Sequence, residues 1–124
     1  MNKKRPKHLA VHKIRLPLPG IVSIFHRISG TILFLALPGL LWMFQASLNS
    51  AETYKQFVSV TEYTVVKLAL ITVMWGFIHH FCAGIRFLLI DLHVISSLNS
   101  ARTSGKWVMA LSLLLTVLTG VRLW

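Results

Sequence analysis

The chain has 124 residues, of which 55% are hydrophobic and only 13% charged. Soluble domains usually carry about 25% charged residues, so the composition argues against a soluble globular protein. Thirteen basic residues against three acidic ones give a formal charge of +10. In a soluble protein this would indicate a nucleic-acid partner, but basic residues that flank apolar runs are typical of membrane proteins. We therefore predict a lipid membrane and no nucleic acid as the environment.

A basic arm opens the chain. Six lysines and arginines lie in it, and Pro6, Pro17 and Pro19 disfavour helix. The change from this arm to apolar sequence predicts two regions. Residues 1–20 form a cytoplasmic N-terminal arm, and residues 21–124 form a single membrane domain.

Three apolar segments follow the arm. They lie at residues 21–48, 63–92 and 106–124. About 20 helical residues cross the hydrocarbon core of a bilayer. The first two segments exceed this length, and the third is just long enough. The polar connection at 49–62 is expected to be partly helical. The predicted fold is all-α and integral to the membrane, with three transmembrane helices.

The distribution of basic residues predicts the topology. The second connection carries Arg102 and Lys106 and no acid, whereas Lys55 in the first is balanced by Glu52 and Glu62. The positive-inside rule then places the N-terminus and the second connection in the cytoplasm. Because three helices enclose little interior, and membrane helices associate by packing and polar contacts, we expect this chain to be part of a hetero-oligomeric helix bundle.

The first polar cluster is SIFHRISG, at residues 23–30. Ser23 and Arg27 are four residues apart and share a helical face, and Gly30 continues that face, so another backbone or a flat ligand could approach. A hydroxyl beside a guanidinium suits hydrogen bonding to a carbonyl or carboxylate. The alternative is that Arg27 reaches lipid headgroups and Ser23 caps the helix.

The second cluster is HHFCAGIRFLLID, at residues 79–91. On a helix, one face carries Gly76, His80, Gly84, Phe87 and Asp91. A histidine with a glycine one turn away on each side predicts flat space beside the helix, as a haem bound through an imidazole requires. The alternative for His80 is a buried neutral histidine bonded to a neighbouring helix.

The other polar residues of the spans have different predicted roles. His79 points about 100° away from His80 and is predicted to be structural. His26 is predicted to lie too near the cytoplasmic surface to pair with His80 across one haem, so a second iron ligand would come from another chain. Arg86 is nearer the cytoplasm than His80 and could meet acidic ligand groups.

Together the two clusters resemble the large membrane-anchor subunit of succinate dehydrogenase, which is the cytochrome b556 subunit in bacteria. Residues 23–30 match the pattern S-I-x-H-R-x-[ST]-G of that family, and residues 80–91 match H-x-x-x-G-I-R-x-x-x-x-D. Both motifs occur in order on the first two of three apolar segments. The resemblance covers essentially the whole chain and outweighs the alternative readings of the two clusters.

The resemblance implies a set of site residues. His80 would be an axial ligand of haem b, and the small anchor subunit would supply the second ligand. The haem propionate pocket would include His26, Arg27, Gly84 and Arg86, and the quinone site would include Ser23, Arg27 and Asp91. Many relatives carry histidine at the position of Phe87, so any haem contact by that histidine is lost here.

The implied function is that of a membrane anchor in succinate:ubiquinone oxidoreductase, not catalytic alone. Its partners would be the small anchor, the iron–sulfur subunit and the flavoprotein, with ubiquinone as substrate, in the bacterial inner membrane. Three alternatives remain open: an anchor of quinol:fumarate reductase, a haem-free structural anchor, and a small transporter or scaffold whose histidines relay protons.

Overall fold

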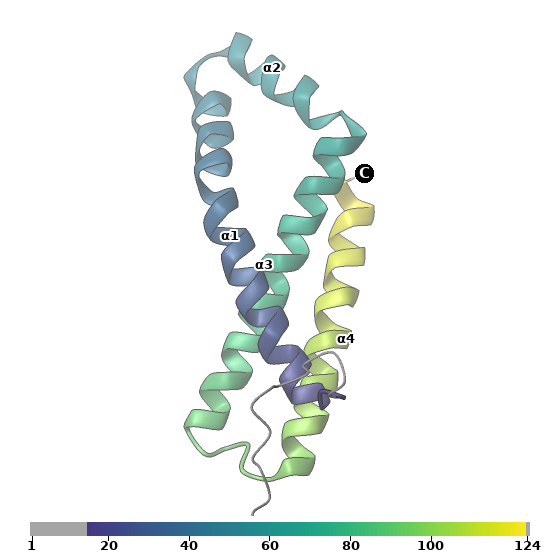
Figure 1. The fold of residues 1–124 in the computed structure, drawn as a ribbon. Coiled ribbons are helices and arrows are strands. Elements are labelled where there is room, and N and C mark those ends of the chain that lie inside the picture. The colour runs from purple at the N-terminus through teal and green to yellow at the C-terminus, as the bar shows by residue number, and fades with distance from the viewer. Residues whose placement is uncertain (1–14, 124) are drawn as a thin grey trace, which may run out of the picture.

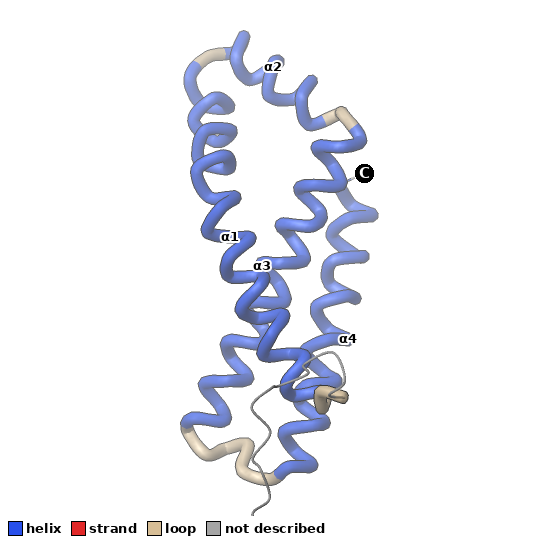
Figure 2. Tube along the Cα trace, in the orientation of Figure 1, coloured by secondary structure: helices blue, strands red, loops and turns tan. Residues whose placement is uncertain are grey.

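The computed structural model describes residues 15–123 and shows them as a bundle of helices (Figures 1 and 2). The helices are α1 (Leu18–Asn49), α2 (Ala51–Thr61), α3 (Thr64–Asp91) and α4 (Leu98–Leu123). No strand occurs in this part of the chain, and α1, α3 and α4 are long and apolar enough to cross a membrane. The prediction of an all-α fold with three spans is confirmed. Most of the basic arm, residues 1–14, lies outside the described residues.

Helix α1 begins at Leu18, three residues before the predicted start at 21 (21 − 18 = 3). Pro19 lies in the first turn, where a missing backbone N–H breaks no intrahelical hydrogen bond. The residue at the N-cap is Pro17, and no side chain caps the helix. Ser23 is therefore inside α1, and the alternative that it caps the helix is wrong.

The first connection forms the short helix α2, which joins α1 to α3 at the upper end of the bundle in Figure 1. Ser50 and Thr53 form a capping box, in which each side chain accepts a hydrogen bond from the other residue's backbone N–H. This reciprocal arrangement satisfies two donors that the helix start would leave unpaired. The expectation of a partly helical connection is confirmed.

The second connection is short because α4 begins at Leu98, eight residues before the predicted 106 (106 − 98 = 8). The Ser97 hydroxyl accepts a hydrogen bond from the backbone N–H of Ser100 at 3.1 Å, which stabilises an early start. The residues before 106 are mostly polar, so hydropathy did not reveal this first part of the helix. They extend α4 beyond its apolar span.

Helix α3 ends in a Schellman motif. The N–H of His93 bonds the carbonyl of Ile90, and the N–H of Val94 bonds that of Leu89. His93 has a φ of 59°, the left-handed conformation that this motif requires and that glycine usually supplies. The resulting sharp turn returns the chain towards α4 at the lower end of Figure 1.

The two ends of the bundle differ in packing. We call residues 18–30, 76–91 and 98–112 the N-terminal half, and residues 31–75 and 113–123 the α2 half. Among the described residues, the buried side chains of the N-terminal half are Val22, Ser29, His79, Ala83, Arg86, Val108 and Ser112. The α2 half contributes only Thr116 to this set. The core therefore sits in the N-terminal half and is largely polar.

Candidate functional site

The imidazole of His80 contacts helix α1. Its Nδ1 atom lies 3.0 Å from the backbone carbonyl oxygen of His26 and 3.3 Å from the hydroxyl oxygen of Ser29. A carbonyl oxygen can only accept, so this contact assigns the tautomer with the proton on Nδ1, which donates a hydrogen bond to the His26 carbonyl. The neutral ring then keeps its lone pair on Nε2, the tautomer that a metal-binding histidine needs.

Glycines let α1 and α3 approach at this site. A Cβ atom at Gly30 would lie 2.9 Å from Cε1 of His80, and one at Gly84 would lie 3.8 Å from Nε2 of His26. A Cβ atom at Gly76 would face Ser29 at 4.0 Å. The flat space expected beside His80 between its glycines is therefore filled by α1. Small residues at helix contacts in membranes commonly serve such close packing.

His26 lies level with His80, not nearer the surface as its place in the sequence suggested. The two rings stack with their centroids 4.1 Å apart and an interplanar angle of 9°. Flat faces in direct contact leave no room for a macrocycle between them, so His26 and His80 do not bind one iron from opposite sides in this arrangement. The ring of Phe87 packs against that of His26, with the two ring centroids 5.2 Å apart.

His79 has a different environment from its neighbour in sequence. It is fully buried, and its Nδ1 lies 3.4 Å from the hydroxyl of Ser112 on α4. Its ring stacks on that of Trp75 with the centroids 5.3 Å apart, and meets the Phe25 ring edge-on with the centroids 6.0 Å apart. Its Nε2 is buried, and no atom of residues 15–123 is hydrogen-bonded to it. Enclosed by α1, α3 and α4, His79 is placed as a packing residue.

Arg86 faces helix α4. Its Nε donates to the hydroxyl of Ser104 and its Nη2 to the carbonyl of Ala101, both at 3.0 Å. The side chain is only 3% exposed, and its Nη1 is buried without a hydrogen-bond partner. Arg86 thus joins α3 to α4 through a buried cation whose hydrogen bonding is incomplete within the described residues.

The remaining predicted residues lie nearer the solvent or lipid. Ser23 is half-buried and Arg27 is exposed, one turn apart on α1, and neither side chain has a polar partner among residues 15–123. Asp91 is exposed at the last residue of α3, where a negative charge is disfavoured by the helix dipole. The structure leaves these three side chains available to another molecule.

The residues around His80 fit a haem better than a metal ion held by side chains alone. Residues 15–123 contain no group of three or more His, Cys, Asp or Glu side chains that could hold a metal ion. The macrocycle of a haem supplies most of the iron's ligands itself, so one histidine with an available Nε2 is enough from this chain. His80 is only partly buried, and its protonated Nδ1 is already satisfied.

An exposed apolar stripe runs along α3 beside His80. It consists of Phe77, Phe81, Ile85 and Leu88, which are between 47% and 60% exposed. Such spacing places these side chains on one helical face. No described residue covers them.

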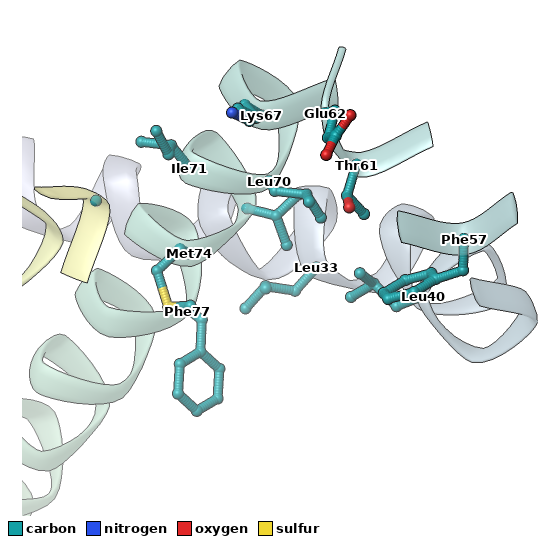
Figure 3. Close-up of a pocket in the computed structure, with 12 residues that line it drawn as sticks. Leu33, Leu40, Phe57, Thr61, Glu62, Lys67, Leu70, Ile71, Met74 and Phe77 are labelled. Carbon is teal, nitrogen blue, oxygen red and sulfur yellow. The ribbon is translucent and has the colours of Figure 1, made fainter. Parts of the chain in front are cut away.

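A hollow lies in the α2 half, between α1, α2 and α3. It has a volume of about 680 Å³, and Figure 3 shows mainly leucine, isoleucine, methionine and phenylalanine side chains around it. Thr61, Glu62 and Lys67 lie together along one side. No histidine or cysteine lines it, so it lacks the imidazole and thiolate side chains that commonly ligate a haem iron.

Fold and site together define an integral membrane protein whose first and second spanning helices pack closely around the ring of His80. The chain belongs to the family of succinate dehydrogenase/fumarate reductase transmembrane subunits, which it matches over residues 1–119. The family indicated by the two sequence motifs is confirmed.

Full-length relatives carry one name. The succinate dehydrogenase cytochrome b556 subunit of Coxiella burnetii is 35% identical, over 100% of both chains. That of Rickettsia felis is 32% identical over 95% of this chain and 92% of the relative. That of Paracoccus denitrificans is 30% identical over 95% of this chain and 89% of the relative.

Proposed function

We propose that this chain is the membrane-anchor subunit of a succinate:ubiquinone oxidoreductase, in which it binds haem b and forms part of the quinone site. The observation that carries the proposal is the engagement of His80 Nδ1 by the His26 carbonyl, 3.0 Å away. This bond directs the lone pair to Nε2 and raises the basicity of the ring as a metal ligand.

His80 is the proposed axial ligand, and the second is assigned to the small anchor subunit. That subunit would cover the exposed apolar stripe on α3, which runs beside His80. A bound haem would supply one-electron redox chemistry, while this chain supplies its position and electrostatic surroundings.

The proposed haem pocket includes His26, Arg27, Gly84 and Arg86. His26 supports the ligand through its ring and its carbonyl group, and Gly84 allows the His26 ring to lie against α3. Arg86 is a buried cation whose Nη1 has no hydrogen-bond partner among residues 15–123, and we propose a haem propionate as the partner that completes its hydrogen bonding. A buried guanidinium is strongly stabilised by such a charged hydrogen-bond partner.

The proposed quinone site consists of Ser23, Arg27 and Asp91. Reduction of a quinone to a quinol takes up two electrons and two protons, and negative charge develops on the carbonyl oxygens. The guanidinium of Arg27 would stabilise that charge, and the hydroxyl of Ser23 would donate a hydrogen bond to the same end of the ring. Asp91 would be a nearby polar group that supports the site.

The partners and location follow from the same proposal. A flavoprotein would oxidise succinate, and an iron–sulfur subunit would carry the electrons to the quinone at the membrane surface. The complex would lie in the bacterial inner membrane with the N-terminus of this chain in the cytoplasm. The relatives' shared name and the excess of basic residues at the N-terminal end support this arrangement.

Two other functions would use the same fold: an anchor of quinol:fumarate reductase and a haem-free structural anchor. The family includes fumarate reductases, but the similar full-length relatives are named succinate dehydrogenase subunits, which favours succinate oxidation. A haem-free structural anchor would also use the bond between His80 and His26. The full-length relatives are named cytochrome b556 subunits, which favours haem binding over a purely structural role.

The test is a dithionite-reduced minus oxidised absorption spectrum of the complex, purified with its native partners, for the wild type and His80→Ala. We expect a b-type haem signal in the wild type and its loss or strong alteration in the variant. A wild-type complex with flavin but no haem would leave only a structural anchor. An unchanged signal in His80→Ala would move the ligand to another residue.

A further inference from the structure

Two residues to which the proposed function gives no role of their own, Ser29 and Gly30, surround the imidazole of His80. Ser29 is fully buried, and its hydroxyl donates to the His26 carbonyl oxygen at 2.9 Å. The same hydroxyl oxygen is 3.3 Å from His80 Nδ1. Gly30 follows directly, and the space where a Cβ atom would lie at this position is next to Cε1 of the His80 ring.

We infer that Ser29 and Gly30 are positioning residues for His80 as a haem ligand: Ser29 tunes the hydrogen bond that Nδ1 donates to the His26 carbonyl, and Gly30 leaves the space in which the ring keeps its orientation. The inference rests on the proposed haem ligation by His80. Residues of α1 would then make the supporting contacts to an iron ligand, His80, that belongs to α3.

Ser29 acts through a shared acceptor. The carbonyl oxygen of His26 receives both the Ser29 hydroxyl and the protonated Nδ1 of His80. The strength of the Nδ1 hydrogen bond sets how strongly the imidazole donates to iron, and so affects the reduction potential. Because the Ser29 hydroxyl donates to the same oxygen, it weakens the hydrogen bond that this oxygen accepts from Nδ1. Removal of the hydroxyl strengthens the Nδ1 hydrogen bond, makes the imidazole a stronger donor and so favours ferric iron.

Gly30 acts through space. A Cβ atom there would lie 2.9 Å from Cε1 and 3.3 Å from Nδ1 of His80. The atoms it would meet belong to a ring, which cannot bend away as a flexible chain end does. The His26 ring already lies against one face of the imidazole at a centroid distance of 4.1 Å. Any side chain at position 30 therefore turns or displaces His80.

The first experiment compares Gly30→Ala with Gly39→Ala in the complete complex. Position 39 is on the same helix, and a Cβ there would meet nothing within 4 Å. The measurement is the rate of haem transfer from the purified complex to apomyoglobin. We expect transfer about 10–100-fold faster for Gly30→Ala, the usual cost of disturbing contacts behind a metal ligand. Equal rates in the two variants would overturn the inference.

The second experiment needs no bulky change and decides the question if Gly30→Ala does not assemble. Ser29→Ala is compared with Ser47→Ala, whose lost hydroxyl bonds only the Phe44 carbonyl on its own helix. The measurement is the midpoint potential of the haem, with the electron paramagnetic resonance signal of its ferric form. We expect a lower potential for Ser29→Ala alone. Identical potentials and spectra in both variants would contradict the role of Ser29.

A third variant separates positioning from packing. Ser29→Thr keeps the hydroxyl, and the position that Ser29 faces on α3, Gly76, carries no side chain. We expect Ser29→Thr to restore the wild-type potential, whereas a pure packing role predicts no such rescue. A wild-type complex without haem would overturn the proposed function and this inference together. A haem-containing wild type whose variants match their controls would overturn only this inference.

Discussion

The N-terminal half and the α2 half of the bundle use the same three long helices in different ways. In the N-terminal half, glycines bring α1 within hydrogen-bonding distance of α3, and the buried set includes Ser29, His79, Arg86 and Ser112. In the α2 half, α1 and α3 are bridged by α2 and border a mainly apolar hollow of about 680 Å³. Buried polar groups are costly in a membrane, so their concentration in one half indicates where function lies.

The adjacent histidines give the sharpest test within the N-terminal half. We expect His80→Ala to abolish the b-type haem signal, because it removes the proposed iron ligand. His79→Ala should keep the signal and lower the melting temperature of the detergent-solubilised complex, because a large buried side chain lost from a core costs about 2–4 kcal/mol. Loss of haem in His79→Ala with haem retained in His80→Ala would exchange the two roles.

An arginine from each half tests whether the quinone site lies in the N-terminal half. Arg27→Ala should lower quinone reduction by about 10–100-fold, since hydrogen bonds to charged groups contribute about 1.5–3 kcal/mol. Haem content should fall less than quinone reduction, because Arg27 is one of several residues in the proposed haem pocket. Arg122→Ala removes an exposed arginine from the α2 half and is the matched control. Succinate-dependent reduction of a soluble quinone measures both, and equal activities would remove Arg27 from the quinone site.

A difference in packing should be visible as a difference in tolerance to larger side chains. Ala83 is fully buried in the core cluster of the N-terminal half, so Ala83→Leu should destabilise the complex by about 1–3 kcal/mol. Val73 lines the hollow of the α2 half, so Val73→Phe should cost less than about 1 kcal/mol, because it fills space already present. Melting temperatures of the purified complexes compare the two, and similar losses would mean that the hollow is filled in the assembly.

The smallest expected effect concerns the turn that closes the N-terminal half. His93 has a φ of 59°, which costs a non-glycine residue about 1–2 kcal/mol. His93→Gly removes that cost but frees the unfolded chain, so we expect a net gain of about 0.5–1 kcal/mol. A small rise in melting temperature is the expected result, and a fall would show that the imidazole makes a stabilising contact in the assembled complex.

Hydropathy was sufficient to predict the three spans, because the bilayer imposes a minimum length on any crossing helix. It failed at the start of α4, where residues 98–105 are helical but mostly polar. Their helix is supported by the Ser97 hydroxyl, a local capping interaction that a hydropathy average does not register. Likewise α1 starts at Leu18, because Pro19 lies where proline is tolerated.

The sequence indicated the residues of the candidate site but not the contacts between them. Both clusters were found from their motifs, and His80 was separated from His79 by the angle between neighbouring helical residues. The contact of Ser29 with His80 was missed, since a serine three residues after His26 ordinarily bonds only its own helix. Its motif position beside Gly30 was the available signal. The approach of α3 turned that ordinary bond into a contact with His80.

Composition, hydropathy and two short motifs were enough to establish a membrane protein, its number of spans, its family and the helices that carry its polar residues. These properties follow from local chemistry and from the length of helix that a bilayer requires. Only the packed bundle decided that His26 stacks on His80, that α1 fills the space beside Gly84, and that Arg86 bonds to α4. Such contacts depend on how helices cross and rotate against one another, and that depends on side chains distant in the chain.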